Sequence, residues 1–102
     1  MKFDLKDYHG AISDYTKAIE IFPQDSISYA NRGLTKAYLK DYQGAIDDLS
    51  KAIEIIPGID SFYADRGIAK ESLGDLKGAC DDWRKAADLG DERSAERVKK
   101  QC

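Results

Sequence analysis

The chain has 102 residues, of which 42% are hydrophobic and 34% charged, so it is long enough for one small core and too short for two. Its formal net charge of −3 leaves little basic surface for nucleic acid, and we expect no nucleic-acid partner. No apolar run approaches the roughly 20 residues of a membrane helix, and the N-terminus resembles neither a secretory signal nor a transit peptide. We therefore expect no membrane partner and a cytoplasmic location.

The first predicted helix spans residues 8–22, and a similar sequence recurs 34 residues later. Residues 7–23 and 41–57 are identical at twelve of seventeen positions. The same shift aligns residues 28–42 with 62–76, and a third copy begins at Asp75. A period of this length is typical of a helix-turn-helix unit that buries its apolar face only against copies of itself. The sequence therefore predicts an all-α solenoid of antiparallel helix pairs.

Apolar residues recur at helical spacing within each copy, and no strand-like alternation is present. The predicted helices cover residues 8–22, 27–39, 42–56, 61–73, 76–89 and 92–101. Turn and stop residues lie between them, namely Pro23, Lys40–Asp41, Pro57 and Gly74–Asp75. Ser26 and Asp60 stand where a side-chain oxygen would cap the following helix.

A family resemblance covers nearly the whole chain. It is carried by Tyr29, Arg32, Gly33 and Lys36 followed by Ala45, Leu49, Ala52 and Pro57, and again by Tyr63, Arg66, Gly67, Ala79, Trp83 and Ala86. These residues and their spacing resemble the tetratricopeptide repeat. The small residues of the pattern allow two antiparallel helices to pack closely, and the large Leu49 and Trp83 fill the space between them.

The resemblance divides the single domain into about two and a half repeats and a capping helix. Residues 1–25 form a truncated first repeat, 26–59 the second, 60–91 the third, and 92–102 a solvating cap with Ala95, Val98 and Cys102 turned inward. The third repeat departs from the pattern because Asp91 replaces the closing proline. The run from Trp83 to Asp91 also resembles Sel1-like repeats.

The resemblance implies a peptide-binding groove on the concave face, which the first helix of each pair lines. The implied groove residues are Ile27, Ala30, Asn31, Leu34, Ala37 and Tyr38 from one repeat and Ser61, Ala64, Asp65, Ile68, Glu71 and Ser72 from the next. Leu34 and Ile68 have an equally good interpretation as packing residues between neighbouring helices. Asn31 matches an asparagine of the clamp that holds chaperone C-terminal tails. Asp65 stands in place of a clamp arginine and would repel such a tail.

The frame of the resemblance implies that the first repeat lacks most of its own first helix. Ala11, Tyr15 and Ala18 form a stripe equivalent to positions that a complete repeat covers, and only Phe3 and Leu5 remain to cover it. The stripe predicts a homodimer through this N-terminal edge, either across a two-fold axis or with a swapped helix. The other explanation is that the chain is a fragment of a longer array.

Candidate catalytic and metal-binding groups are few. The pairs Asp47–Asp48 and Asp81–Asp82 recur with the repeat, and we expect them on a solvated face. The single histidine, His9, has no nucleophilic partner near it in sequence. We therefore predict no catalytic site, no metal site and no cofactor.

The two cysteines, Cys80 and Cys102, are too few and too far apart in sequence for a disulfide framework or a zinc site. We expect both to be reduced thiols. Cys80 replaces the isoleucine found at Ile12 and Ile46, which indicates a small buried side chain and argues against redox chemistry there.

The sequence as a whole favours a non-catalytic module that binds another protein or peptide in the groove. The alternative is a structural unit that self-assembles through its N-terminal edge. An enzyme is the least favoured hypothesis.

Overall fold

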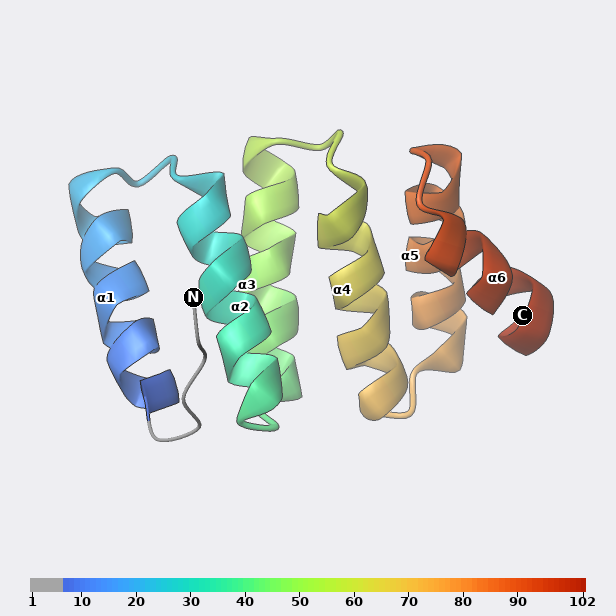
Figure 1. The fold of residues 1–102 in the computed structure, drawn as a ribbon, viewed down its shortest axis with the longest axis horizontal. Helices are drawn as coiled ribbons and strands as arrows, with labels where there is room; N and C mark the ends of the chain where they lie inside the picture. The colour runs from blue at the N-terminus through green and yellow to red at the C-terminus, as the bar shows by residue number, and fades with distance from the viewer. Residues whose placement is uncertain (1–6) are drawn as a thin grey trace.

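The computed structural model describes residues 7–102, which form six α-helices and, within that range, no strand. The helices are α1 (Tyr8–Ile21), α2 (Ser26–Tyr38), α3 (Tyr42–Ile55), α4 (Asp60–Ser72), α5 (Leu76–Asp88) and α6 (Glu92–Gln101). Successive helices lie side by side in chain order and alternate in direction from α1 to α5, with α6 at the far end (Figure 1). The prediction of an all-α helix-pair solenoid is confirmed.

Aspartates begin most of the helices. The residue before the helix accepts a hydrogen bond from a backbone N–H three positions later in the pairs Asp25–Ser28, Asp41–Gly44, Asp75–Gly78 and Asp91–Ser94. The prediction that Ser26 and Asp60 are caps is wrong, because each is the first helical residue. The N–H and hydroxyl of Ser28 both donate to Asp25, and these bonds hold the pKa of Asp25 below its usual value.

The predicted turns inside the repeats are confirmed, and they use a left-handed residue. Lys40 has φ 65° and Gly74, which lies 34 positions later, has φ 86°. Glycine adopts this region freely, whereas a side chain with a Cβ is strained there. The turn after α2 therefore stores backbone strain that the equivalent turn after α4 avoids.

The core lies between the paired helices. Leu49 on α3 is 1% exposed and packs with Ala30, Ala52 and Phe62, while Trp83 on α5 is fully buried. Both confirm the space-filling role expected of them. The helices approach closely at the repeat glycines, since a Cβ built on Gly67 would lie 2.5 Å from Nε1 of Trp83. Nε1 of Trp83 finds no hydrogen-bond acceptor among residues 7–102.

One member of each acidic pair is buried, which corrects the prediction of a solvated face. Asp47 is exposed, whereas Asp48 is only 5% exposed. Nε and Nη2 of Arg32 donate to the two carboxylate oxygens of Asp48, each at 2.8 Å, and Nζ of Lys36 lies 3.1 Å away. The carboxylate thus ties α2 to α3, because a buried charge must be paired.

The same network recurs in the next repeat. Asp82 is 4% exposed, and its carboxylate accepts hydrogen bonds from Nε and Nη2 of Arg66 at 2.8 and 2.7 Å. Nζ of Lys70 forms an ion pair with the same carboxylate at 3.1 Å. Nη1 of Arg66 also donates to the hydroxyl of Ser50 on α3 at 3.2 Å. One arginine therefore links its own helix to the helices before and after it.

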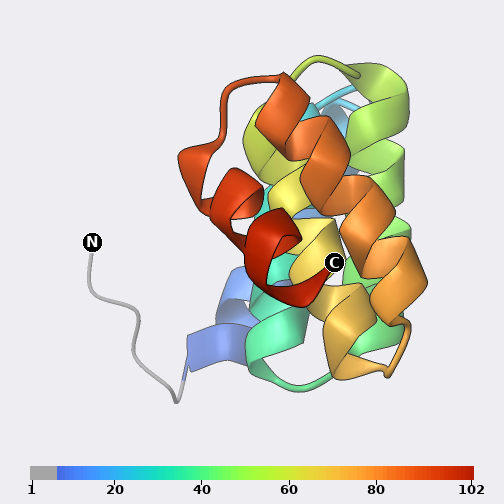
Figure 2. The same cartoon turned by 90° about the vertical axis from the view of Figure 1, so that its right-hand side faces the viewer.

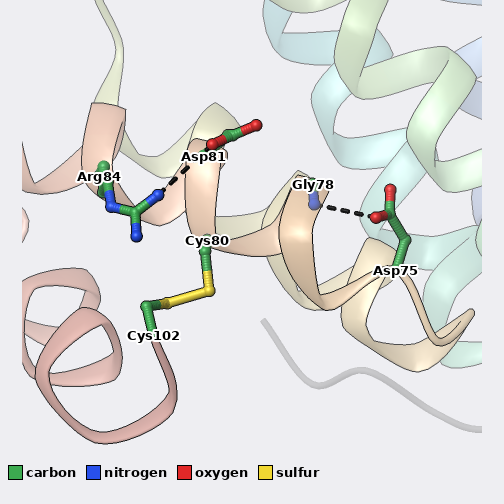
Figure 3. Close-up of a disulfide and its surroundings, with 6 residues drawn as sticks. All are labelled: Asp75, Gly78, Cys80, Asp81, Arg84 and Cys102. Atoms are coloured by element: carbon green, nitrogen blue, oxygen red, sulfur yellow. Dashed lines mark hydrogen bonds and ion pairs between the residues drawn. A yellow bond between two sulfur atoms is a disulfide. The ribbon is translucent and has the colours of Figure 1, made fainter.

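The cysteines form a disulfide, which corrects the prediction of two reduced thiols. Cys80 on α5 and Cys102, which follows α6, are 22 residues apart in sequence. Helix α6 folds back along α5 and brings their Cα atoms to 5.9 Å, within the range that a disulfide spans (Figure 3). Cys80 is also a small buried side chain, as expected, with 6% exposure.

Candidate functional site

A pocket of about 190 Å³ lies between α4 and α6, and we call it the α4–α6 pocket. Figure 2 looks at the molecule from its C-terminal end, where α6 crosses in front of α4 beside α5. The lining residues are Asp60, Ser61, Ala64, Asp65 and Ile68 from α4, with Asp91, Arg93, Ser94 and Arg97 from α6 and the turn before it. Small side chains on α4 leave the space, and charged side chains surround it.

Asp65 is a partly buried acid in the lining of this pocket, and its pKa is raised. Burial, and then the nearby carboxylate of Asp91, raise the pKa of Asp65 to about 6. The Asp91 carboxylate accepts hydrogen bonds from the hydroxyl and the N–H of Ser94, whereas Asp65 forms no hydrogen bond or ion pair within residues 7–102. The pocket thus holds a half-buried acid with no hydrogen-bonding or ion-pairing partner in the described part of the chain.

The α6 side of the pocket was missed by the sequence analysis. Arg97 is half-buried, and its guanidinium lies 5.3 Å from the ring centroid of Trp83, a cation–π arrangement. Arg93 is exposed at the pocket rim. One signal was available, because Ser94 stands 34 residues after Asp60, which places α6 in register with the helices that line the groove.

The groove residues implied on α4 come together, since Ser61, Ala64, Asp65 and Ile68 all line the α4–α6 pocket. Glu71, one turn further along α4, is half-buried and lies outside that lining.

The groove residues implied on α2 are more scattered. Ile27 is 52% and Tyr38 53% exposed, whereas Ala30 is buried in the core cluster with Leu49. Asn31 and Leu34 are half-buried. The ring of Tyr38 stacks on Tyr8 of α1, with centroids 5.5 Å apart and an interplanar angle of 15°. One face of Tyr38 is therefore already occupied.

The residues implied at the N-terminal edge lie on α1. Ala11, Tyr15 and Ala18 are half-buried, whereas the equivalent residues Ala45, Leu49 and Ala52 are at most 1% exposed. A hollow of about 280 Å³ is lined by Asp7, Ala11, Asp14 and Tyr15. Phe3, the fourth residue of this predicted edge, lies outside the described residues.

The described part of the chain lacks the groupings that other classes of site require. Within residues 7–102, no three His, Cys, Asp or Glu residues are grouped so that they would hold a metal ion. None of the six helices has the length and apolar character to cross a bilayer. His9 is exposed near the start of α1.

Comparison with known sequences identifies the repeat. The family model described as tetratricopeptide repeat matches residues 2–25 and 27–58, which is more than half of the chain. No curated protein matches the sequence.

Comparison with solved structures identifies similar folds. The Arabidopsis OM64 TPR domain is 30% identical with a TM-score of 0.88, covering 94% of this chain and 81% of that one. The first TPR of Spaghetti (RPAP3), bound to the HSP90 peptide SRMEEVD, is 25% identical with a TM-score of 0.87, covering 93% and 77%. The second TPR domain of human RPAP3, in complex with the HSP70 peptide SGPTIEEVD, is 27% identical with a TM-score of 0.86, covering 93% and 81%.

Proposed function

Because the chain belongs to the tetratricopeptide repeat family, we propose that it is a non-catalytic module that binds a peptide or helix of another protein in its concave groove. The α4–α6 pocket is the observation that carries this proposal. Four positions that the resemblance assigns to the groove line that pocket, namely Ser61, Ala64, Asp65 and Ile68. Peptide complexes of structural relatives support the same function.

Exposed apolar side chains support a ligand that reaches beyond the pocket. Ile68 at the pocket is 39% exposed, and Ile27 and Tyr38 on α2 are each more than half exposed. Such side chains supply the buried centre of an interface once a partner covers them. We therefore propose a groove that extends from the α4–α6 pocket along α2.

The charge of the pocket favours a ligand unlike those of the relatives. The peptides SRMEEVD and SGPTIEEVD both end in acidic residues. Asp65 would place a carboxylate without a hydrogen-bonding or ion-pairing partner against such an end, and like charges repel strongly in a half-buried site. We propose a ligand without an acidic C-terminal tail.

Peptide selection tests the proposal directly. Random peptides displayed on phage are selected on the immobilised chain, and the enriched peptide is titrated by fluorescence anisotropy. Asn31→Ala and Tyr38→Ala should each weaken its binding about tenfold or more, as expected of groove contacts. Their free energies of unfolding should change by no more than about 1 kcal/mol, because both side chains are partly exposed.

Glu54→Ala is the matched control, because the Glu54 side chain is 72% exposed on α3. It should leave affinity unchanged. The peptide SRMEEVD serves as the acidic probe and should bind more weakly than the selected peptide. Equal loss of affinity in all three variants, or failure to enrich any peptide, would contradict binding in the groove.

A second candidate function is self-association through the edge that α1 presents. It is favoured by the incomplete cover of Ala11, Tyr15 and Ala18 beside a hollow of about 280 Å³. Burying an aromatic ring and its apolar neighbours in a contact between copies would favour a homodimer. The predicted contribution of Phe3 belongs to this proposal.

Light scattering coupled to size exclusion tests self-association. The chain should be dimeric at high concentration, and dilution should shift it toward monomer. Tyr15→Glu should give a monomer at every concentration, because it would bury a charge in the contact. A wild-type chain that stays monomeric at the highest concentration would exclude this candidate and leave peptide binding untouched.

We also propose two further properties of the chain. The first is the Sel1-like character of residues 83–91. The second is the cytoplasmic location, against which the bond between Cys80 and Cys102 weighs, because cytosolic reductants keep most thiol pairs reduced. Extracts prepared with an alkylating agent would distinguish the reduced from the oxidised chain, because only free thiols of Cys80 and Cys102 are alkylated.

A further inference from the structure

Helix α6 is held mainly by its packing on α5. Its apolar residues are Ala95 and Val98, and Val98 packs against Ala79, Cys80 and Trp83. Within residues 7–102, the only ion pair of α6 joins two of its own side chains, from Nζ of Lys100 to Glu96 at 3.9 Å. Helices α2 and α4, in contrast, each direct an arginine and a lysine onto a buried aspartate of the next helix.

The disulfide adds a covalent link between α5 and α6. It joins Cys102, directly after the last turn of α6, to Cys80 in the second turn of α5 (Figure 3). Cys80 is 6% exposed, whereas Cys102 is exposed. The difference in exposure favours attack by an external thiolate at Cys102 over attack at Cys80.

The same helix forms one side of the α4–α6 pocket. Arg93, Ser94 and Arg97 face Asp65 and Ile68 across it. Arg97 also covers the indole of Trp83, which is otherwise enclosed by the core. Any displacement of α6 must therefore open the pocket and uncover Trp83.

We propose that the disulfide between Cys80 and Cys102 is a redox-controlled clasp that closes the pocket when oxidised and releases α6 when reduced. The proposal rests on the proposed function, because it names the regulation of the same groove. The reductant is a dithiol. The exposed residue, Cys102, is the one attacked first.

The reaction proceeds by two thiol–disulfide exchanges. One thiolate of the dithiol attacks Sγ of Cys102, the protein S–S bond breaks, and Cys80 leaves as a thiolate that takes up a proton. The second thiol of the reductant, as a thiolate, then attacks the reductant sulfur that is bonded to Cys102 in the mixed disulfide. Cys102 leaves as a thiolate and is protonated in turn. The products are two protein thiols and the cyclic disulfide of the reductant, so electrons and protons balance.

Reduction should loosen α6 and leave the preceding helices folded. Helix α6 would keep the packing of Val98, the burial of Ser94 and the stacking of Arg97 on Trp83, but it has no ion pair with another helix of the described chain. Helices α2 to α5 keep their buried ion networks, which contain no cysteine. Local opening of this kind is seen as faster amide exchange in one cooperative segment.

Nuclear magnetic resonance on the ¹⁵N-labelled chain tests the clasp, with dithiothreitol as the probe. On reduction, the amides of α6 should exchange at least about tenfold faster while those of α3 and α4 change little. Resonances of Ser61, Asp65 and Ile68 should shift, and Trp83 emission should move to longer wavelength. Unchanged protection of α6 in the reduced chain would overturn the proposal.

Cys102→Ser is the matched variant, because its exposed side chain leaves no cavity behind. It should resemble the reduced wild-type chain and should not respond to dithiothreitol. Reoxidation of the wild-type chain should restore α6 protection, which keeps the test valid if the variant folds poorly. A response of Cys102→Ser to the reductant would also contradict the clasp.

Titration of both redox states with the phage-selected peptide separates the two proposals. Affinity should fall about tenfold or more on reduction, in step with the loss of α6 protection. Equal affinity in both states, with α6 released, would reject regulation and retain peptide binding. Failure of the oxidised chain to bind any selected peptide would reject the proposed function, whereas the exchange data would still report on the clasp.

Discussion

Helices α2 to α5 and helix α6 are positioned by different physical means. Helices α2, α3 and α4 share a buried apolar cluster, and two repeated networks join α2 to α3 and α4 to α5 through one aspartate that pairs with an arginine and a lysine. Helix α6 packs on α5 through Val98, the stacking of Arg97 and the buried Ser94, and the disulfide adds a covalent link. The α4–α6 pocket therefore has one side, α4, that buried ion networks anchor, and another side, α6, that packing on α5 and a disulfide anchor. Binding surfaces are commonly drawn from less stable regions.

The largest expected effect on stability comes from Trp83, which lies in the core of α5 and contacts α6. Trp83 packs with Ala79 in the core, and Val98 and Arg97 of α6 rest on it. Trp83→Ala should lower the free energy of unfolding by about 3–5 kcal/mol, because it leaves a large cavity. Urea denaturation measures this loss. Leu73→Ala, at a site that is 51% exposed, should cost less than about 1 kcal/mol, and equal losses would contradict the assigned core.

The next largest effect on stability is expected from the buried ion networks that join α2 to α3 and α4 to α5. Asp82→Asn removes the charge that pairs with Arg66 and Lys70, and it should lower the free energy of unfolding by about 2–3 kcal/mol. The neighbouring substitution Asp81→Asn is the control, because that side chain is 66% exposed. It should change stability by less than about 0.5 kcal/mol. Similar values for the two variants, from thermal melts, would show that the network is not stabilising.

A smaller effect tests the electrostatics of the pocket. The pKa of Asp65 is raised to about 6, above its unfolded value of about 4, so the folded state holds the proton more tightly. The contribution of Asp65 to stability therefore falls as pH rises from about 4 to about 6. Asp65→Asn should remove this dependence and stabilise the chain at neutral pH by about 1 kcal/mol, a value reduced by partial solvation.

Denaturation of Asp65→Asn across this pH range measures the effect, with Asp47→Asn at an exposed site as the control. The control should leave the pH dependence intact. An Asp65→Asn chain that is less stable than wild type at neutral pH would mean that Asp65 is paired in solution.

The smallest effect concerns the two equivalent turns. Lys40→Gly should raise the free energy of unfolding by up to about 1 kcal/mol, because glycine adopts the positive φ of 65° without strain. Gly74→Ala should have the opposite sign, since its φ is 86°. Melting temperatures measure both changes. A destabilised Lys40→Gly chain would contradict the left-handed turn.

Much of the fold could be predicted from the sequence because the repeat constrains it. A 34-residue period, helical spacing and prolines after the second helices define the helices closely, and Leu49 and Trp83 stand out as the large residues among small ones. The cap of α2 was misplaced by one residue because Asp25 and Ser26 are both good capping residues, and only backbone geometry distinguishes them. The cap of α4 was misplaced because Ile59, which has no side-chain acceptor, occupies that position.

Three-dimensional proximity explains what the sequence did not reveal. Asp48 looks like a surface residue beside Asp47, and its burial depends on Arg32, which lies sixteen residues earlier in the chain. The disulfide depends on how α6 folds back along α5. The α4 side of the pocket follows from the resemblance, whereas Arg97 contributes because of where α6 docks.

The most direct test of the central claim is a map of the ligand on the chain. The ¹⁵N-labelled oxidised chain is titrated with the phage-selected peptide, and amide shifts are followed residue by residue. Binding in the groove predicts the largest shifts at Ser61, Asp65, Ile68 and Arg97, with smaller shifts along α2 and little change on the outer surface of α3. Shifts concentrated on α3 and α5, or on the edge of α1, with the α4–α6 pocket unperturbed, would contradict it.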